Sequence, residues 1–408
     1  MKNLVTIATL FTGTLFMVSC GEDDIISGPT QEELQDAAIE ASQSAVDGLV
    51  TTSSANGMTE DDINAAFSWT KYKDGAQPIA ATERMNVVEN ITVDTEWTND
   101  KVYQLNGRIT VLDGATLTIE AGTRIEGNSD LSGVNAAVLM IARGGKLMAN
   151  GTSSEPIIMT TTDDDGTLDG SKKGLWGGLV ILGKAPVSAK VDNPQIEGVD
   201  ANDTNGLYGG TDAADNSGTI RYVSIRHGGA VIDAAAGDEI NGLTLGGVGS
   251  GTTIEYVEVF ANSDDGIEFF GGTVNVNYAL VAQVGDDAID IDQSYAGTVT
   301  SYAIYVDEDS DEALEIDGRE GSLDDSFTLS TGTATAIDGA SVTCDFKSKA
   351  KGAVSNFNAN GGKIKLSATF DVETLVESED AASNVVDGSL TFNTVNGEFS
   401  VYTKSFDE

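Results

Sequence analysis

Gly242-Leu243-Thr244-Leu245 recurs along the chain as Gly266-Ile267-Glu268-Phe269, Ala288-Ile289-Asp290-Ile291 and Ala313-Leu314-Glu315-Ile316. The leucine and isoleucine anchors of these segments are 24, 22 and 25 residues apart. A second row, around Tyr222, Tyr256, Tyr278 and Tyr302, keeps spacings of 34, 22 and 24 residues. Two rows that share one period indicate that each unit is one coil of a solenoid.

The repeating units are strands. Apolar and polar residues alternate within them, and glycine or Asp-Gly marks the bends, with no helical pattern between them. This excludes helical and leucine-rich solenoids and predicts an all-β protein, a parallel β-helix whose coils stack about 4.8 Å apart. An antiparallel sandwich also has short strands, but it does not predict that whole coils realign. We expect the β-helix over 67–340 and a small β-rich cap, with antiparallel strands, over 341–408.

Composition limits the partners. The 408 residues include 22 Lys+Arg and 65 Asp+Glu, for a net charge of -43. A surface of this kind does not bind nucleic acid, which requires basic residues to release counterions, and a polyanion would need a bridging cation. A single histidine, His227, excludes a two-histidine metal site.

The N-terminus predicts a targeting signal. A short basic start precedes an apolar run over 4–18, which is shorter than the roughly 20 residues that span a bilayer. Met17-Val18-Ser19-Cys20 resembles a bacterial lipobox, which implies a signal peptide over 1–19 and lipid, including palmitate, on Cys20. The alternative is an ordinary signal peptide. The acidic run 21–24 resembles the export signal of Bacteroidetes lipoproteins, which implies a lipid-anchored protein on the outer face of the outer membrane.

Residues 20–66 are expected to form an acidic tether and an amphipathic helix. Thr30-Gln31-Glu32-Glu33 matches a capping box, and leucine and alanine follow at helical spacing through 31–50. Residues 51–66 are rich in Ser, Thr and Asp and are expected to be linker.

Acidic residues recur at the same offset in adjacent coils. Asp264 and Asp265 follow Tyr256 by eight and nine residues, as Asp286 and Asp287 follow Tyr278. Stacked carboxylates repel unless they are protonated or bridged, and Ca²⁺ prefers such oxygen ligands. We therefore expect a calcium site formed by Asp264, Asp265, Asp286, Asp287, Asp290 and Asp292. The alternative is a solvated acidic edge that prevents aggregation.

The tyrosine row also has two interpretations. Tyr256, Tyr278 and Tyr302, with Tyr222, either pack as an aromatic stack at a bend of the coil or present a platform that binds sugar rings.

The segments from Trp97 through Gly127, Ile141 to Met159, Leu175 to Lys184 and Asn241 to Asp265 resemble a family of right-handed parallel β-helix proteins. These are secreted or lipid-anchored proteins, common in Bacteroidetes, with pectate-lyase-like architecture. The resemblance covers roughly 86–330 and implies the fold without implying one activity.

Enzymes of this architecture suggest what a catalytic site would contain. Lyases place a Lys or Arg beside calcium, and residues 227–318 contain neither. Polygalacturonases resemble this chain at Asp264-Asp265 and Asp286-Asp287, but they carry a Gly-His-Gly and an Arg-Ile-Lys after the aspartates, whereas His227 lies before them. We expect a non-catalytic, surface-anchored lipoprotein whose calcium-loaded face binds a glycan, a matrix or an outer-membrane partner. The alternatives are a polysaccharide-degrading hydrolase or lyase, and an accessory subunit of an outer-membrane uptake complex.

Overall fold

The computed structural model describes residues 57–70, 72, 81–200, 202–233, 239–370, 383–386 and 389–402. The predicted signal peptide, the lipidation site at Cys20 and the predicted helix over 31–50 lie outside these ranges. No helix in the described ranges is long and apolar enough to cross a membrane.

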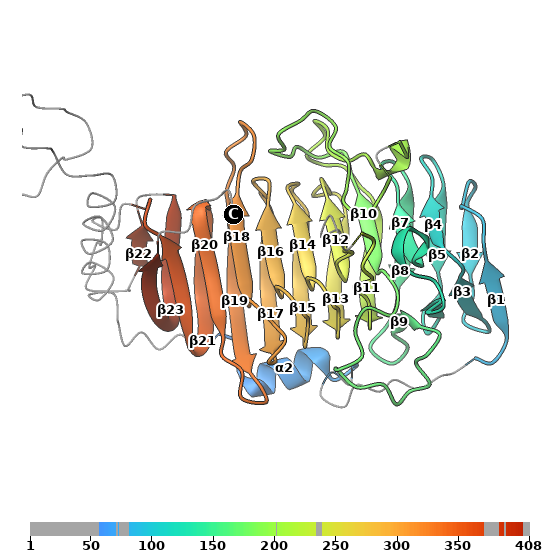
Figure 1. The fold of residues 1–408 in the computed structure, drawn as a ribbon, viewed down its shortest axis with the longest axis horizontal. Helices are drawn as coiled ribbons and strands as arrows, with labels where there is room; N and C mark the ends of the chain where they lie inside the picture. Colours follow the sequence, from blue (N-terminus) through green and yellow to red (C-terminus); the bar gives the residue numbers. More distant parts are fainter. Residues whose placement is uncertain are drawn as a thin grey trace, which may run out of the picture.

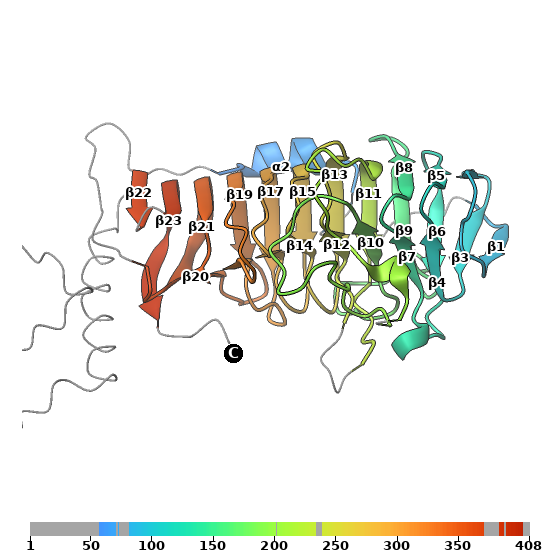
Figure 2. The same ribbon diagram turned by 90° about the horizontal axis from the view of Figure 1, so that it is seen from above.

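The chain winds into one elongated solenoid of short strands (Figures 1 and 2). In chain order the strands are β1 (Arg84–Val87), β2 (Thr95–Trp97), β3 (Val102–Leu105), β4 (Arg108–Val111), β5 (Thr116–Ile119), β6 (Arg124–Gly127), β7 (Val138–Ile141), β8 (Lys146–Asn150), β9 (Ile157–Thr161), β10 (Leu179–Leu182), β11 (Gly218–Arg226), β12 (Leu243–Gly246), β13 (Thr253–Phe260), β14 (Ile267–Phe270), β15 (Asn275–Ala282), β16 (Ile289–Asp292), β17 (Thr298–Val306), β18 (Leu314–Gly318), β19 (Phe327–Ala336), β20 (Thr343–Lys349), β21 (Gly352–Ser367), β22 (Ser383–Val386) and β23 (Leu390–Tyr402). Helix α2 (Glu60–Phe67) and the 3₁₀ turns Gly133–Asn135 and Thr204–Gly206 complete the described elements.

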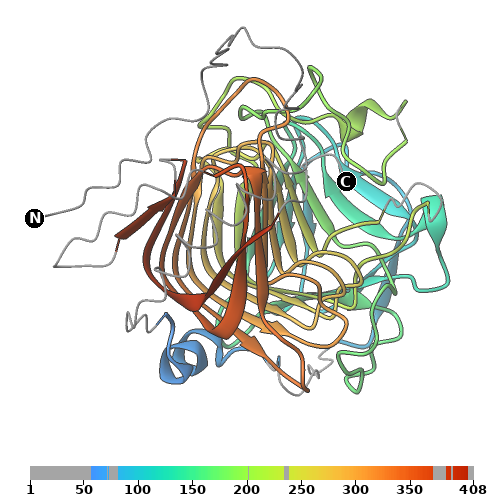
Figure 3. The same cartoon turned by 60° about the vertical axis from the view of Figure 1, so that its left-hand side comes forward.

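Apart from β22, each strand pairs in parallel with the equivalent strand of a neighbouring coil. One face is formed by β4, β7, β10, β12, β14, β16, β18 and β20, in that order. The strands β11, β13, β15, β17 and β19 pair in the same way on the other side of the coil. The stacked coils are visible in Figure 3. The predicted right-handed parallel β-helix is therefore confirmed.

The core is a set of stacked apolar columns. Leu243, Ile267, Ile289 and Leu314 occupy equivalent positions on successive strands, and all are fully buried. Burial of such a side chain contributes roughly 1.5–3 kcal/mol relative to exposure. The row identified in the sequence is thus the inward-facing column that holds the coils in register.

Parallel pairing continues beyond residue 340. Cys344 aligns with Leu314, Ile364 with Cys344, and Phe399 with Ile364, so the inward column runs on through β20, β21 and β23. Among the described strands beyond residue 340, only β22 pairs antiparallel, with the first part of β23. The expected antiparallel arrangement is therefore wrong for most of this region, because these residues still supply the buried side chain that each coil needs.

Helix α2 (Glu60–Phe67) occupies the end of the segment expected as linker over 51–66, and residues 51–56 lie outside the described residues. The Thr59 side chain accepts a hydrogen bond from the Asp62 backbone N–H, the Asp62 carboxylate accepts one from the Thr59 N–H, and Ile63 and Phe67 are buried. The helix lies across the coils of β13, β15 and β17 (Figures 1 and 2) and packs against Leu280. A two-sided cap and one apolar stripe stabilise this short helix only because the solenoid covers the stripe.

Candidate functional site

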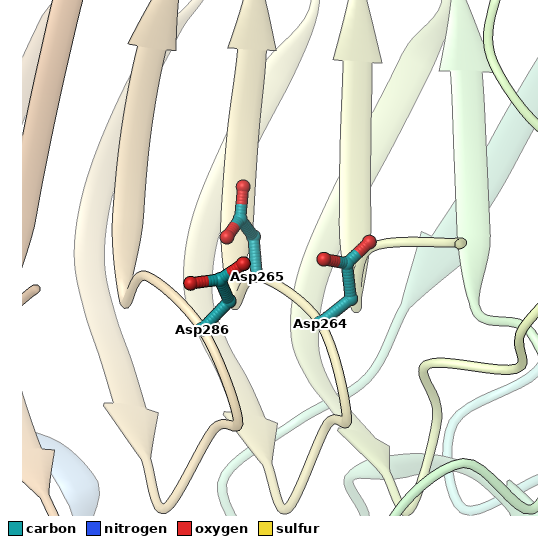
Figure 4. A group of neighbouring side chains, drawn as sticks. All are labelled: Asp264, Asp265 and Asp286. Carbon is teal, nitrogen blue, oxygen red and sulfur yellow. The ribbon is translucent and has the colours of Figure 1, made fainter. Parts of the chain in front are cut away.

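The acidic residues gather where loops enter three neighbouring strands. Asp265 precedes β14, Asp287 precedes β16 and Glu312 precedes β18, each two residues before an inward Ile or Leu. The strand register aligns these three positions and also the outward-facing Glu268, Asp290 and Glu315. Figure 4 shows the carboxyl groups of Asp264, Asp265 and Asp286 at the entries to β14 and β16.

Local sequence fixes where the loop delivers Asp265. The next residue is Gly266, where an added Cβ would lie 2.3 Å from Val281 Cγ1 and 2.5 Å from the Ala288 carbonyl oxygen. A side chain cannot fit there. Because Gly266 has none, the backbone can come close to the next coil, and this holds Asp265 beside Asp287. Gly242, in the preceding coil, is restricted in the same way by Val259.

Three groups of carboxylates lie close enough to share an ion. In each group one ligand atom per residue lies within 4.8 Å of the others: Asp264, Asp265 and Asp286; Asp265, Glu268 and Asp290; and Asp287, Glu312 and Glu315. The first two groups share Asp265, and all of these residues except Glu312 line a cavity of about 140 Å³. Its lining residues are Glu197, Asn241, Asp264, Asp265, Glu268, Asp286, Asp287, Asp290 and Glu315.

Backbone hydrogen bonds orient the carboxylates. Asp265 Oδ1 accepts the N–H of Asp287 at 2.9 Å, and Asp287 Oδ1 accepts the N–H of Glu312 at 2.7 Å. The Asn241 amide donates to Glu268 and, at 3.1 Å, to Glu197. The site is thus fixed in position by the coil stacking itself.

Burial and mutual repulsion raise the pKa values of these acids. Burial, with the charges of Glu197 and Glu239, raises the pKa of Asp264 to about 7, and burial with the charge of Asp311 raises that of Asp286 to about 6. Burial places the pKa of Asp265, Glu268 and Asp290 well above the usual range. These carboxylates therefore stay ionised only beside a compensating cation, and otherwise they bind a proton.

Lysines supply that compensation at one end of the acidic row only. Lys347 Nζ lies 2.7 Å from both Glu315 Oε1 and Asp317 Oδ1, and Lys365 Nζ lies 2.5 Å from Glu312 Oε1. Both lysines come from later coils, on β20 and β21. They lie outside the segment 227–318, in which the sequence was found to contain no Lys or Arg, and were therefore not predicted. The alternation of lysine with apolar residues in Lys363-Ile364-Lys365 is the signal that could have found them.

The other end of the row carries no such partner. Within the part of the chain that the structure describes, no Lys or Arg forms an ion pair with Asp264, Asp265, Glu268, Asp286 or Asp290. Two lining oxygens, Asn241 Oδ1 and Asp290 Oδ1, are buried and have no hydrogen-bond partner among the described residues.

These residues fit a hard divalent cation. All the available donors are carboxylate or amide oxygens, which Ca²⁺ prefers, and the unpaired Asn241 Oδ1 and Asp290 Oδ1 provide ligand atoms beside Asp265 and Glu268. Of the predicted calcium ligands, the structure brings Asp264, Asp265, Asp286, Asp287 and Asp290 to one cavity. Asp292 lies outside it; burial and the charge of Asp317 raise its pKa. Glu268 and Asn241 are ligand candidates that the sequence analysis did not name.

The tyrosine row is shorter than predicted. Tyr222, Tyr256 and Tyr278 stack with ring centroids 4.4 and 4.5 Å apart. The register then aligns Tyr278 with Ser301, because Ala279 pairs with Tyr302. Including Tyr302 in this row was wrong: its ring is fully buried and packs on Phe357, in the space left by Gly332. Tyr302 faces the core because it lies on the inward side of β17.

His227 lies away from the acidic cavity. It is fully buried, with φ of 60°, and its Nδ1 lies 2.6 Å from the Lys172 carbonyl oxygen. Burial lowers its pKa, so the ring is neutral at pH 7. It lines neither the acidic cavity nor the groove beside the tyrosines.

Comparison with known proteins agrees with this architecture. A family model described as a pectate-lyase like beta helix domain matches residues 89–406. No curated protein and no solved structure gives a match. The family points to a polysaccharide-related function without distinguishing binding from catalysis. The match extends over most of the chain, and the protein belongs to the pectate-lyase like beta helix family.

Proposed function

We propose that this protein is a non-catalytic binding protein that holds an acidic glycan through Ca²⁺ bound in the carboxylate cavity. Asp265, Glu268, Asp290 and Asn241 would hold the ion, with Asp264 and Asp286 at the rim of the cavity. The ion would supply positive charge to which a sugar carboxylate can bind. This role suits a chain of net charge -43, which repels a polyanion in the absence of a bridging cation.

The observation that carries the proposal is the asymmetry of the acidic row. Lys347 and Lys365 neutralise the end near β20, whereas the buried carboxylates near β14 lack an ion-pair partner among the described residues. A merely solvated edge would leave its acids exposed, but Asp265, Glu268 and Asp290 are no more than 7% exposed. Buried charge of this kind requires compensation.

We further propose that the protein is lipid-anchored at Cys20 and faces the exterior of the outer membrane. The support is the sequence before residue 21: a basic start, a short apolar run and a cysteine after small residues. The described solenoid would then present its acidic face to polymers outside the cell. Metabolic labelling with a palmitate analogue, compared between the natural chain and Cys20→Ala, tests the anchor.

Titration calorimetry tests the cation site. We expect Ca²⁺ to bind the natural protein and Asp290→Asn to bind it at least about tenfold more weakly, because a buried ligand oxygen loses its charge. Glu308→Gln removes the same charge from an exposed position in a nearby coil and serves as the control. The proposal fails if no heat and no thermal shift appear at millimolar Ca²⁺, or if the two variants weaken binding equally.

Glycan binding needs a separate measurement. Oligogalacturonate is the probe, titrated with Ca²⁺ and again with EDTA. The proposal predicts binding that disappears with EDTA and with Asp290→Asn, while the probe is recovered uncleaved.

A second candidate is cleavage of the polysaccharide. It is favoured by Lys365, which lies 2.5 Å from Glu312 at the edge of the acidic row and gives the row the cationic group that the sequence search had not found. Close carboxylates with raised pKa values can also serve as acid and base. Release of shorter oligosaccharides that is lost in Asp286→Asn and retained in Glu308→Gln would favour the enzyme.

A further inference from the structure

A groove separate from the acidic cavity lies between α2 and the tyrosine stack. Its volume is about 620 Å³. The tyrosine side is formed by Tyr222, Tyr256 and Tyr278, with Ser301 and Thr331 in the coils that follow. The helix side is formed by Met58, Asp62, Ala65, Ala66, Ser68 and Trp69, and Ser153 also lines the groove.

The aromatic stack ends at Tyr278 although its backbone position continues. Tyr222, Tyr256, Tyr278, Ser301 and Thr331 all have φ between 49° and 61° and occupy equivalent positions in successive coils. Ser301 is the first of them without a ring. In the described part of the chain, no aromatic ring covers the face of Tyr278 that points toward the coil of Ser301.

The spacing of the coils suits one more ring. Coils repeat about every 4.8 Å, and the existing rings lie 4.4 and 4.5 Å apart with interplanar angles of 6° and 5°. A six-membered ring placed above Ser301 would meet Tyr278 at about the distance at which the tyrosines meet one another. The hydroxyl groups of Ser301 and Thr331 lie on the same side of the groove.

Polar groups in the groove point to a neutral, hydroxyl-bearing ligand. The Trp69 indole N–H is buried and has no hydrogen-bond partner among the described residues. Asp62 is the only charged residue among the described residues that line the groove, and its carboxylate already accepts hydrogen bonds from the Thr59 N–H at 3.0 Å and from the Thr59 hydroxyl at 2.6 Å. Among the residues that the structure describes, no Lys or Arg lines the groove.

We propose that this groove binds a neutral oligosaccharide. One pyranose ring stacks on the open face of Tyr278, and a hydroxyl group of the same oligosaccharide accepts a hydrogen bond from the Trp69 indole N–H. The C–H face of a pyranose suits the ring face of tyrosine, and the flanking hydroxyls suit the polar lining. This site does not depend on the cation or on the acidic cavity.

The decisive variant fills the gap. Ser301→Tyr extends the stack by one ring at a backbone position where three tyrosines already stand, so it should fold and should occupy the space of the sugar. Tyr278→Ala removes the platform, and Trp69→Phe removes only the N–H donor. Circular dichroism and thermal melting verify that each variant is folded.

The probes are neutral hexasaccharides of glucose, xylose and mannose, titrated in EDTA and followed by calorimetry. We expect at least one of these probes to bind. Ser301→Tyr and Tyr278→Ala should each reduce its affinity about tenfold or more, because either change removes the stacking of the sugar on Tyr278. Glu308→Gln, at an exposed residue that lines neither the groove nor the acidic cavity, should leave the affinity unchanged.

Two results overturn the inference. One is that no probe binds in the millimolar range; the other is that a probe binds and Ser301→Tyr does not weaken it. Either result leaves the calcium proposal intact, because that proposal is tested by oligogalacturonate in the presence of Ca²⁺.

Discussion

Asp265 Oδ1 accepts the backbone N–H of Asp287 at 2.9 Å, across the boundary between two coils. Asp287 repeats the relationship with Glu312, at 2.7 Å. Each bond fixes one carboxylate oxygen against the next coil and leaves the other available to the cavity. The ladder of strands therefore also aligns the acidic groups, and conditions that change their charge should act on stability and binding together.

Calcium affinity should rise with pH. Asp264, with a pKa of about 7, and Asp286, with a pKa of about 6, hold protons that a cation must displace. We expect Ca²⁺ binding to strengthen steadily as the pH rises from 5 through 7, since Asp265, Glu268 and Asp290, whose pKa values are also raised, must lose protons as well. Calorimetry at pH 6 in buffers of different ionisation enthalpy should show protons released on binding; buffer-independent heats would contradict this.

The cation-free protein should lose stability as pH rises. The pKa values of Asp264 and Asp286 are higher in the folded state than in the unfolded state, so between about pH 4 and pH 7 the folded state binds more protons and the free energy of unfolding falls with pH. Thermal melting in EDTA should give a lower Tm at pH 8 than at pH 5. The double variant Asp264→Asn with Asp286→Asn should flatten this slope, and an unchanged slope would assign the effect to other groups.

Replacing Lys347 should create a second cation site. Its ammonium group lies 2.7 Å from both Glu315 and Asp317, so its removal would leave two carboxylates without a neutralising charge. Although burial lowers the lysine's pKa, its bonds to the two acids raise it overall, so the charge is firmly held. Lys347→Met should lower the Tm in EDTA and add a further, weaker equivalent of Ca²⁺ in calorimetry.

Lys351→Met is the matched control for that experiment. Lys351 pairs with Asp324 at 3.0 Å, but both side chains are substantially exposed, at 33% and 48%. An exposed pair of this kind contributes little to stability, about 0–1 kcal/mol. Equal loss of stability in the two variants, or unchanged stoichiometry in Lys347→Met, would argue against the role given to Lys347.

Ile289→Ala should be strongly destabilising. Ile289 lies in the inward column between Ile267 and Leu314 and is fully buried, so its truncation leaves a cavity that costs about 2–5 kcal/mol. Chemical denaturation measures the change. Val191→Ala, at a side chain that is 64% exposed, should alter the free energy of unfolding by no more than about 0.5 kcal/mol.

The sequence predicts the β-helix well because each coil has to bury a side chain at the same place. Leu243, Ile267, Ile289 and Leu314 satisfy that requirement at spacings close enough to be seen without a structure. Asp264 and Asp286 keep the same offsets, so their alignment could be predicted too. The prediction ended where the connections between coils change length. Leu314 and Cys344 are 30 residues apart, so the coil that carries Lys347 was not recognised as part of the repeat.

Two errors have a common physical origin. Tyr302 was aligned with Tyr278 by residue type, whereas the register follows the apolar residues that face inward and therefore pairs Tyr278 with Ser301. Most of helix α2 was taken as linker because the segment 51–66 is rich in Ser, Thr and Asp. Only Thr59, Asp62, Ile63 and Phe67 carry its signal, and their contribution depends on the solenoid surface beneath them.

The segment around α2 determines how the rod would be held. Gly57 is pressed against Gly332, Thr333 Oγ1 donates to the Met58 carbonyl oxygen at 2.8 Å, and further along Thr70 donates to Glu258. Whatever precedes Gly57 thus joins the molecule on its flank, beside β19, and not at the tip near β1. A tether attached there would let the long axis lie along a supporting surface, and would bring the tyrosine groove nearer to that surface than a rod standing on its end would.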